Sequence, residues 1–234
     1  MSTVMTVRDG SASIADLLDP LIGRMTGDEK HAAAAQSTTD VLWVLYDRVL
    51  RVDPHDPEHP DRDRFVLSKD HGPMAYYAVL AAKGFFPAAW LDDWATFDSP
   101  LGMHPDRVLV PGVEVSSGSL GHGLPIGVGM ALGLRVKRSS ARVVVLVGDA
   151  ELDEGSNHEA IAVAGRASLG GLTVVVVDNQ SSTTGWPGGI ARRFEVEGWD
   201  ARTIDGRDHA ALYDALTHVA DRPTAVVAVV EKKG

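Results

Sequence analysis

Three uninterrupted runs of apolar residues, most of them β-branched, constrain this fold more than any other feature of the sequence. They are VVVLV at residues 143–147, TVVVV at 173–177 and AVVAVV at 225–230. A strand with one face in water alternates apolar and polar residues, whereas a strand of a parallel sheet is covered on both faces and reads as a continuous apolar run. Each run therefore predicts a central parallel strand, and the layers that cover it are expected to be helices.

Helical patterns fill the segments between and before these runs. Residues 156–168 separate the first two runs and end at Gly170-Gly171, which gives a βαβ unit of ordinary length. The other expected elements are helical regions over residues 14–50, 73–83, 88–97, 117–134 and 209–219, and a short strand over residues 65–67. We expect a loose tail over residues 1–12 and a single domain over residues 13–234, with an α/β fold of a mostly parallel sheet and helices on both faces.

Composition excludes several classes of protein. The chain has no Cys, so a disulfide scaffold and thiolate chemistry are both excluded. With 22 Lys and Arg against 32 Asp and Glu, the formal net charge of −10 argues against non-specific nucleic-acid binding. Residues 117–134 carry no formal charge, but their glycines, a Pro and a His make them too polar for a membrane span. The first residues lack the pattern of a signal peptide, so we expect a cytoplasmic protein with no membrane or nucleic-acid partner.

A carboxylate and an amide follow the first two apolar runs at their carboxyl ends. Asp149 stands in GDA directly after residues 143–147, and Asn179 stands in DNQS directly after residues 173–177. In open parallel sheets ligands bind beyond the carboxyl ends of the strands. Carboxylate and amide oxygens suit Mg²⁺ or Ca²⁺, and the amides at the start of the next helix favour a phosphate. The pattern indicates a metal–diphosphate site, although Asp and Asn are also common turn residues at strand ends.

Three segments of the chain resemble the transketolase family, in the family's order. GDAELDEGSNHEA followed by DNQSS resembles its thiamine-diphosphate motif. DRDRFVLSKDHGPMAYYAVLAAKGF and GMHPDRVLVPGVEVSSGSLGHGL resemble two segments that precede that motif. The resemblance extends from about His31 to Gly234 and covers only the N-terminal, diphosphate-binding half of a transketolase. It implies the thiamine-diphosphate-binding fold, with thiamine diphosphate and Mg²⁺ or Ca²⁺ as cofactors.

The resemblance implies a role for each matching residue. The expected metal ligands are the side chains of Asp149 and Asn179 and the backbone oxygen of Ser181. The expected cofactor contacts are His71, Gly118, Leu120, Gly148, Asp149, Ala150 and Asn179. The residues expected to act in catalysis are His104 and His31 near the substrate, and Glu154 and Glu159 in communication between active sites.

Several of these residues also have a plain structural interpretation. His71 has the context of a turn residue, His104 that of a loop residue, and His31 that of an exposed helical residue in KHAAAAQ. Glu159 stands three residues after Ser156, which is the spacing of a capping box.

Two departures from the family pattern accompany the resemblance. Ala150 replaces the second Gly of the motif, and its methyl group narrows the backbone approach to a diphosphate. The final residues, EKKG, fall where the family begins a further segment with another active-site His. The resemblance also implies a separate partner protein, which carries the pyrimidine-binding domain with the activating Glu, and a heterotetramer as the natural assembly.

The function that the resemblance implies first is transfer of a two-carbon ketol unit between sugars. Another thiamine-diphosphate reaction is the alternative, as in the first component of a 2-oxo acid dehydrogenase or an acyloin synthase. A third hypothesis is a non-catalytic regulatory homologue. Retention of Asp149, Asn179, His71 and His104 argues against the third.

Overall fold

A five-stranded parallel sheet forms the centre of the computed structural model, which describes residues 14–26, 29–69 and 72–230. Its strands are β1 (Arg64–Leu67), β2 (Val143–Gly148), β3 (Leu172–Asp178), β4 (Asp200–Asp205) and β5 (Thr224–Val229). They lie in the order β1-β2-β3-β5-β4, and every neighbouring pair is parallel. The three apolar runs are β2, β3 and β5, so the predicted α/β fold with a parallel sheet is confirmed.

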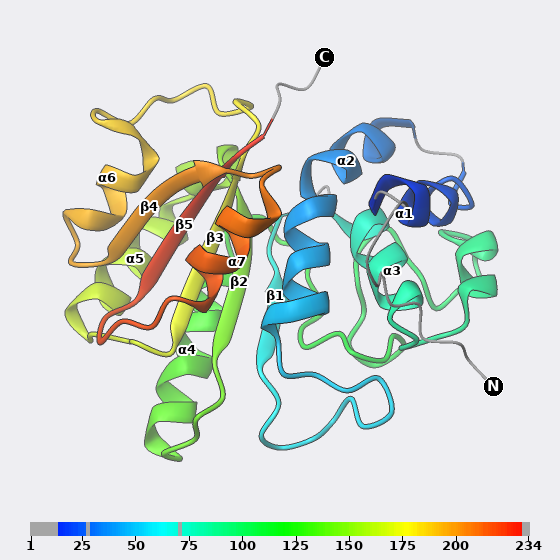
Figure 1. The fold of residues 1–234 in the computed structure, drawn as a ribbon, viewed down its shortest axis with the longest axis horizontal. Helices are drawn as coiled ribbons and strands as arrows, with labels where there is room; N and C mark the ends of the chain where they lie inside the picture. Colours follow the sequence, from blue (N-terminus) through cyan, green and yellow to red (C-terminus); the bar gives the residue numbers. More distant parts are fainter. Residues whose placement is uncertain (1–13, 27–28, 70–71, 231–234) are drawn as a thin grey trace.

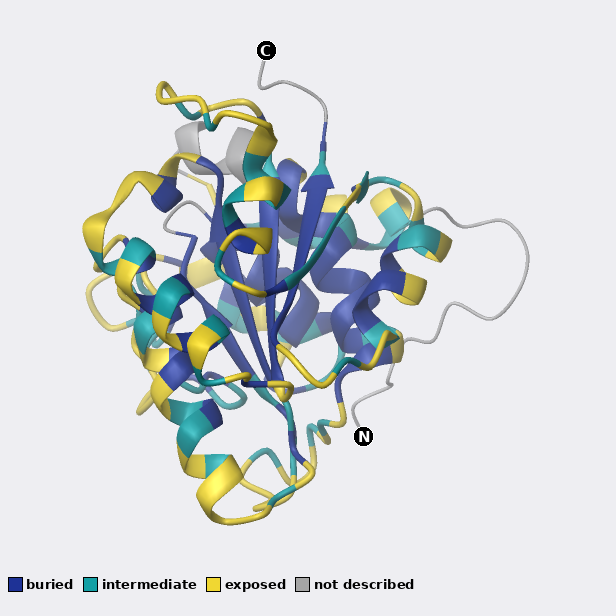
Figure 2. Cartoon of the chain, turned by 90° about the vertical axis from the view of Figure 1, so that its left-hand side faces the viewer, coloured by how far each residue is buried: buried dark blue, intermediate teal, exposed yellow. Residues whose placement is uncertain are grey.

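Alternate residues of each central strand pack into separate apolar layers on the two faces of the sheet. In β2, Val143, Val145 and Val147 belong to one layer, whereas Val144 and Leu146 belong to the other. All six residues of β2 are buried, as the dark strands at the centre of Figure 2 show. This two-sided burial is the reason why these strands carry no alternating polar residues.

Helices cover both faces of the sheet (Figure 1). The layer that contains Val144 is covered by α1 (Ile14–Ile22), α2 (Glu29–Val44), the π-helical turn η1 (Leu45–Val49), α3 (Pro73–Ala82) and α7 (His209–Thr217). The opposite layer is covered by α4 (Gly123–Val136), α5 (Gly155–Arg166) and α6 (Gly189–Glu195). Two 3₁₀ turns complete the described elements, η2 (Ala88–Asp93) and η3 (Ala150–Asp153).

The structure corrects several of the expected element bounds. The helical region over 14–50 is divided into α1, α2 and η1, and the Gly-rich helix α4 begins at Gly123 rather than at residue 117. β4 and α6 had no expected counterpart. The tail expected over residues 1–12 lies outside the described residues, and the single domain over residues 13–234 remains a prediction.

Glycines let α4 approach the sheet closely. A Cβ atom added at Gly127 would stand 2.4 Å from Cγ2 of Val145, and one at Gly123 would stand 2.3 Å from Cβ of Ser68. Any larger residue at either position would push α4 away from β1 and β2. The expected close packing of this helix is therefore present, although its outer face exposes Ile126 and Val136.

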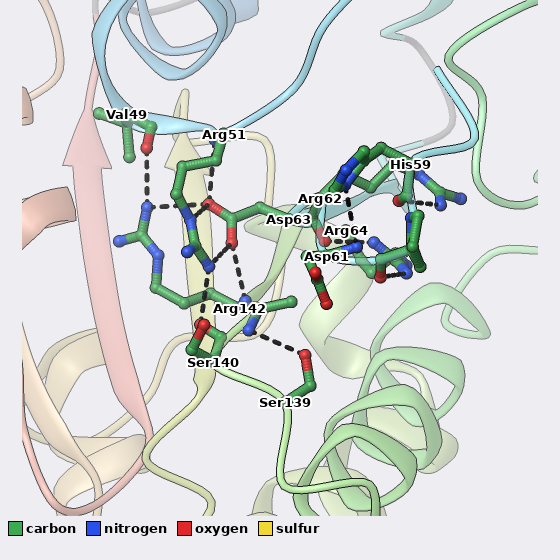
Figure 3. Close-up of polar contacts among 12 residues, drawn as sticks. Val49, Arg51, His59, Asp61, Arg62, Asp63, Arg64, Ser139, Ser140 and Arg142 are labelled. Carbon is green, nitrogen blue, oxygen red and sulfur yellow. Dashed lines mark hydrogen bonds and ion pairs between the residues drawn. The ribbon is translucent and has the colours of Figure 1, made fainter. Parts of the chain in front are cut away.

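A buried carboxylate joins segments at the amino-terminal edge of the sheet (Figure 3). Asp63 is fully buried, and its oxygens accept hydrogen bonds from the backbone amides of Arg51 (3.0 Å) and Arg142 (2.8 Å). The guanidinium groups of the same two arginines lie 2.9 and 3.3 Å from the carboxylate. Arg142 also donates to the carbonyl oxygen of Val49 (2.7 Å). This network fixes the edge opposite to the one where Asp149 and Asn179 stand.

Candidate functional site

Asp149 and Asn179 lie at the carboxyl ends of two adjoining strands. Gly148, the last residue of β2, pairs with Val177 of β3. The backbone amide of Asp149 donates to the carbonyl oxygen of Val177 (3.2 Å). The exposed fractions are only 1% for Asp149 and 5% for Asn179. The expectation that the two residues stand at neighbouring strand ends is therefore confirmed.

The oxygens of these two residues have the character that a hard cation needs. The carboxylate of Asp149 accepts from the Ser181 hydroxyl (2.7 Å) and the Ser182 amide (2.8 Å), both of which are neutral donors. Oδ1 of Asn179 is buried and accepts no hydrogen bond from any described residue. A buried carboxylate needs a cation or strong donors, and a buried amide oxygen needs a partner. The pair therefore fits a divalent cation, which takes oxygen ligands.

Ser181 lies beside Asp149, where its backbone oxygen is expected to bind a metal. In this structure its side-chain hydroxyl donates a hydrogen bond to the Asp149 carboxylate. Within the described ranges, no three His, Asp or Glu side chains gather in a way that would hold a metal. The expected ligand set differs from such a cluster, because it combines one carboxylate, one amide and one backbone oxygen.

A second buried carboxylate lies next to Asp149 and was not among the predicted site residues. Glu151 is 2% exposed and accepts from the backbone amides of Gly148 and Gly121, each at 3.1 Å. It also accepts from the hydroxyl of Ser68, at the end of β1. Lys69 follows Ser68, is buried, and packs its methylene groups near Gly148. The carboxyl ends of β1 and β2 are thus joined through one side chain.

The loop before α4 brings His104 and Gly118 together. Gly118 has a φ of +130°, and a Cβ atom added there would stand 2.8 Å from Cγ of His104. The imidazole therefore lies against a backbone that only glycine allows. Leu120 is 41% exposed two residues later. Since Gly121 binds Glu151, this loop is attached to the segment that carries Asp149.

Ala150 and the two expected glutamates lie on the segment after β2. Ala150 is the first residue of η3 and is exposed, and its φ is not positive, so the backbone there does not require glycine. Glu154 and Glu159 are both exposed, and Glu154 lies against Gly121. The capping box proposed for Glu159 is wrong, because the hydroxyl of Ser156 donates to the carbonyl oxygen of Gly121 (2.7 Å) and α5 begins one residue earlier.

The side chains of two expected histidines lie outside the described part of the structure. His71 lies outside the described residues, and His31 lies on the backbone of α2 without a described side chain. The other end of α2 is anchored by Asp40, which accepts from Arg207 (2.6 Å) and bonds His209 (2.7 Å). Burial alone would raise the pKa of Asp40, but the hydrogen bonds from His209 and Arg207 outweigh it and hold that pKa below its usual value.

A signal in the sequence points to some of the residues that were missed. Ser68 and Lys69 directly follow the strand over residues 65–67, at the same carboxyl edge as Asp149 and Asn179. The rule that places ligands beyond strand ends applies equally to β1. Glu151 has no comparable signal, because its burial depends on three segments that meet only in the folded chain.

No helix in the described part of the chain combines the length and the apolar character needed to cross a membrane. Comparison with known families matches residues 25–230 to a family described as transketolase, thiamine diphosphate binding domain.

Named relatives cover most of this chain. Ferredoxin fas2 of Rhodococcoides fascians is 59% identical over 93% of this chain and 72% of its own length. One subunit of the apulose-4-phosphate transketolase of Actinobacillus succinogenes is 36% identical over 85% of this chain and 75% of its own length. The 6-deoxy-6-sulfo-D-fructose transketolase subunit SqwG of a Clostridium species is 35% identical over 80% of this chain and 70% of its own length. The present chain has no Cys, so it lacks the thiolates that hold iron–sulfur clusters in ferredoxins.

Solved structures of transketolases share the fold. Transketolase from Leishmania mexicana superposes with a TM-score of 0.78 at 25% identity, over 94% of this chain and 37% of that one. Transketolase from Campylobacter jejuni gives a TM-score of 0.75 at 22% identity, over 94% of this chain and 38% of that one. This chain therefore spans little more than a third of the length of these transketolases.

Proposed function

The chain belongs to the transketolase family as an N-terminal subunit with the family's thiamine-diphosphate-binding domain, and we propose that it holds Mg²⁺–thiamine diphosphate in a split enzyme. The reaction we assign to that enzyme is transfer of a two-carbon ketol unit between sugars. One observation carries the cofactor assignment: the buried carboxylate of Asp149 and the Asn179 side-chain oxygen, which no described residue bonds, lie at the ends of adjoining strands. The names of two relatives, both transketolase subunits for sugar substrates, support ketol transfer rather than 2-oxo acid chemistry.

Asp149, Asn179 and the backbone oxygen of Ser181 would hold the cation, which is Mg²⁺ or Ca²⁺. A bound cation would neutralise a diphosphate at the carboxyl edge of the sheet, where we assign Gly148, Ala150 and His71 as contacts of that diphosphate. Thiamine diphosphate, when bound, supplies the electron sink for breaking a carbon–carbon bond next to a carbonyl.

The remaining residues of the site act on the substrate and on cofactor placement. Gly118 and Leu120 would contact the organic part of a bound cofactor, and they lie on the loop against which His104 packs. We assign to His104, which is exposed, the role of orienting a hydroxyl of the sugar donor and stabilising charge that develops there. His31 is assigned the same task from α2. Glu154 lies just before α5 and Glu159 lies on it, and both are exposed. We assign these two residues to communication with a second active site.

A separate protein completes this site. We infer that it carries the pyrimidine-binding domain with the activating Glu, and that the two chains form a heterotetramer in the cytoplasm. Two observations support such a contact: α4 and α5 expose Ile126, Val136 and Val163, and relatives of similar coverage are named as subunits.

Cofactor titration of the chain, purified from its host with any copurifying protein, tests the proposal. In Mg²⁺ buffer, the Asp149→Ala and Asn179→Ala variants should each lose affinity for thiamine diphosphate by more than about 100-fold, beyond the range for outer-shell partners. Calorimetry in Mg²⁺ and in EDTA measures both the affinity and its dependence on the metal.

Asp205→Ala is the matched control, because Asp205 also ends a strand of the sheet and accepts a hydrogen bond from a backbone amide, that of Arg207 (2.8 Å). It lies on the outer strand β4, and the affinity of this variant should equal that of the wild type. Binding that is insensitive to EDTA, or unchanged by Asp149→Ala, would remove the metal assignment.

A further inference from the structure

A single buried carboxylate connects three backbone segments around the candidate site. Oε1 of Glu151 accepts from the Ser68 hydroxyl and from the Gly121 amide, and Oε2 accepts from the Gly148 amide. These donors come from the end of β1, the loop before α4 and the end of β2. The bridge extends one step further, since the Ser68 hydroxyl accepts from the amide of Gly123, the first residue of α4.

The connected segments carry residues assigned to the cofactor. Gly148 directly precedes Asp149 in the chain. Gly121 directly follows Leu120 and lies three residues after Gly118, against which His104 packs. Glu151 itself is not assigned to the metal, and both of its carboxylate oxygens accept hydrogen bonds from other parts of the protein. The Glu151 carboxylate therefore holds the neighbouring backbone segments in place.

The donor set requires a carboxylate rather than an amide at this position. An ionised carboxylate accepts at both oxygens, whereas the amide of Gln accepts at one end and donates at the other. In a Gln side chain, an NH₂ group would face either the Gly148 amide or the Gly121 amide together with Ser68. Either arrangement places two donors against each other at a buried position, which leaves a backbone amide without an acceptor.

We propose that Glu151 is a positioning residue, whose carboxylate fixes the backbone of Gly148 and Gly121 so that the cofactor-binding groups are in place before the cofactor arrives. This inference rests on the proposed function, because it assigns a role within the same site. The advantage is preorganisation: the loops lose their freedom on folding and not on binding. Removal of the carboxylate should therefore weaken cofactor binding by more than the accompanying loss of stability explains.

Asp63→Asn is the matched control for Glu151→Gln. Both changes convert a buried carboxylate that binds two backbone amides into an amide side chain. They differ in place, since Asp63 lies at the amino-terminal edge of the sheet and Glu151 lies at the carboxyl edge. A purely structural role for Glu151 predicts the same behaviour for both variants.

The first readout needs no cofactor. Hydrogen–deuterium exchange, followed per residue by NMR, should show faster exchange at the amides of Gly148 and Gly121 in Glu151→Gln than its global loss of stability explains. In Asp63→Asn, exchange at both amides should rise only as far as its global loss of stability explains. Ser68→Ala gives a milder test if Glu151→Gln does not fold, and it should raise exchange at the Gly123 amide. Wild-type exchange at Gly148 and Gly121 in Glu151→Gln would overturn the proposal, as would wild-type exchange at Gly123 in Ser68→Ala.

The second readout is affinity for thiamine diphosphate in Mg²⁺, measured on the same proteins by calorimetry. We expect Glu151→Gln to bind about 10- to 100-fold more weakly, the range for outer-shell partners, and Asp63→Asn to bind as the wild type does. Equal affinity of Glu151→Gln and wild type would overturn the positioning role. If neither the wild type nor Asp63→Asn binds the cofactor, the proposed function fails instead, and the exchange rates still decide whether the bridge exists.

Discussion

At the residue scale, the site depends on where neutral donors and unpartnered oxygens lie. Asp149 is buried and accepts from a hydroxyl and a backbone amide, and Asn179 has a buried oxygen without a partner among the described residues. His104 differs from both because it is exposed and packs against Gly118. The first two residues therefore suit binding, and His104 suits chemistry at the open side of the site.

His104→Ala should separate these two roles. Loss of an imidazole that stabilises charge or moves a proton lowers kcat by about 100-fold or more, while affinity for thiamine diphosphate should stay at the wild-type value. Steady-state kinetics of the assembled enzyme with ketose donors, beside a cofactor titration, measures the two effects. His218→Ala is the control, since His218 is exposed and pairs with Asp200, the first residue of β4, at the amino-terminal edge of the sheet. An unchanged rate with every donor tested would leave His104 as a loop residue.

Part of this site can be predicted from the sequence. Asp149 and Asn179 are predicted to lie at neighbouring strand ends, because uninterrupted apolar runs identify buried parallel strands from the sequence alone. Glu151 cannot be predicted in this way. A glutamate in the turn GDAELDEG looks like a solvated residue, and only the fold shows that Ser68 and Gly121 approach it from distant parts of the chain.

At the element scale, the predicted and observed elements agree best where a strand is buried on both faces. β2, β3 and β5 were predicted because burial leaves their sequences almost without polar residues. β4 was missed because it is an edge strand with the sequence DARTID, and its residues are only partly buried or exposed. α6 was missed because it has only seven residues and follows a Pro-Gly-Gly turn.

Asp63 connects elements rather than residues of the site, so its removal should lower stability and spare function. Asp63→Asn should lower the free energy of unfolding by about 3 kcal/mol, the low end for breaking a buried ion pair, because Arg51 is half exposed. Urea unfolding at pH 7 measures this change. A loss below about 0.5 kcal/mol, as for an ordinary surface substitution, would contradict this role of Asp63.

The same residue predicts how stability depends on pH. Burial alone would raise the pKa of Asp63, but hydrogen bonds from Arg51 and the Arg142 amide outweigh it, and the folded pKa lies below the usual value. A group with a lowered folded pKa stabilises the protein above its unfolded pKa of about 3.9, and that contribution is lost as pH falls through the folded pKa. Wild-type stability should therefore fall more steeply below about pH 4 than that of Asp63→Asn. Parallel pH dependences for the two proteins would contradict this assignment.

At the scale of the whole molecule, the proposed function gives this chain one side of an active site. Its sheet, its candidate metal ligands and its diphosphate-side loops lie within the segment that matches the thiamine-diphosphate-binding domain of transketolases. It spans 37% of the length of a solved transketolase. The proposed function assigns the rest of the site to a separate partner protein. The apolar side chains exposed on α4 and α5 are consistent with such a contact.

Native mass spectrometry of the tagged chain, purified gently from its own host in Mg²⁺ buffer, tests the split-enzyme proposal most directly. We predict a complex of this chain with a second protein, with added mass for thiamine diphosphate and Mg²⁺ that is lost in EDTA. A lone chain or a self-dimer without the cofactor, even after thiamine diphosphate is added, would contradict that proposal.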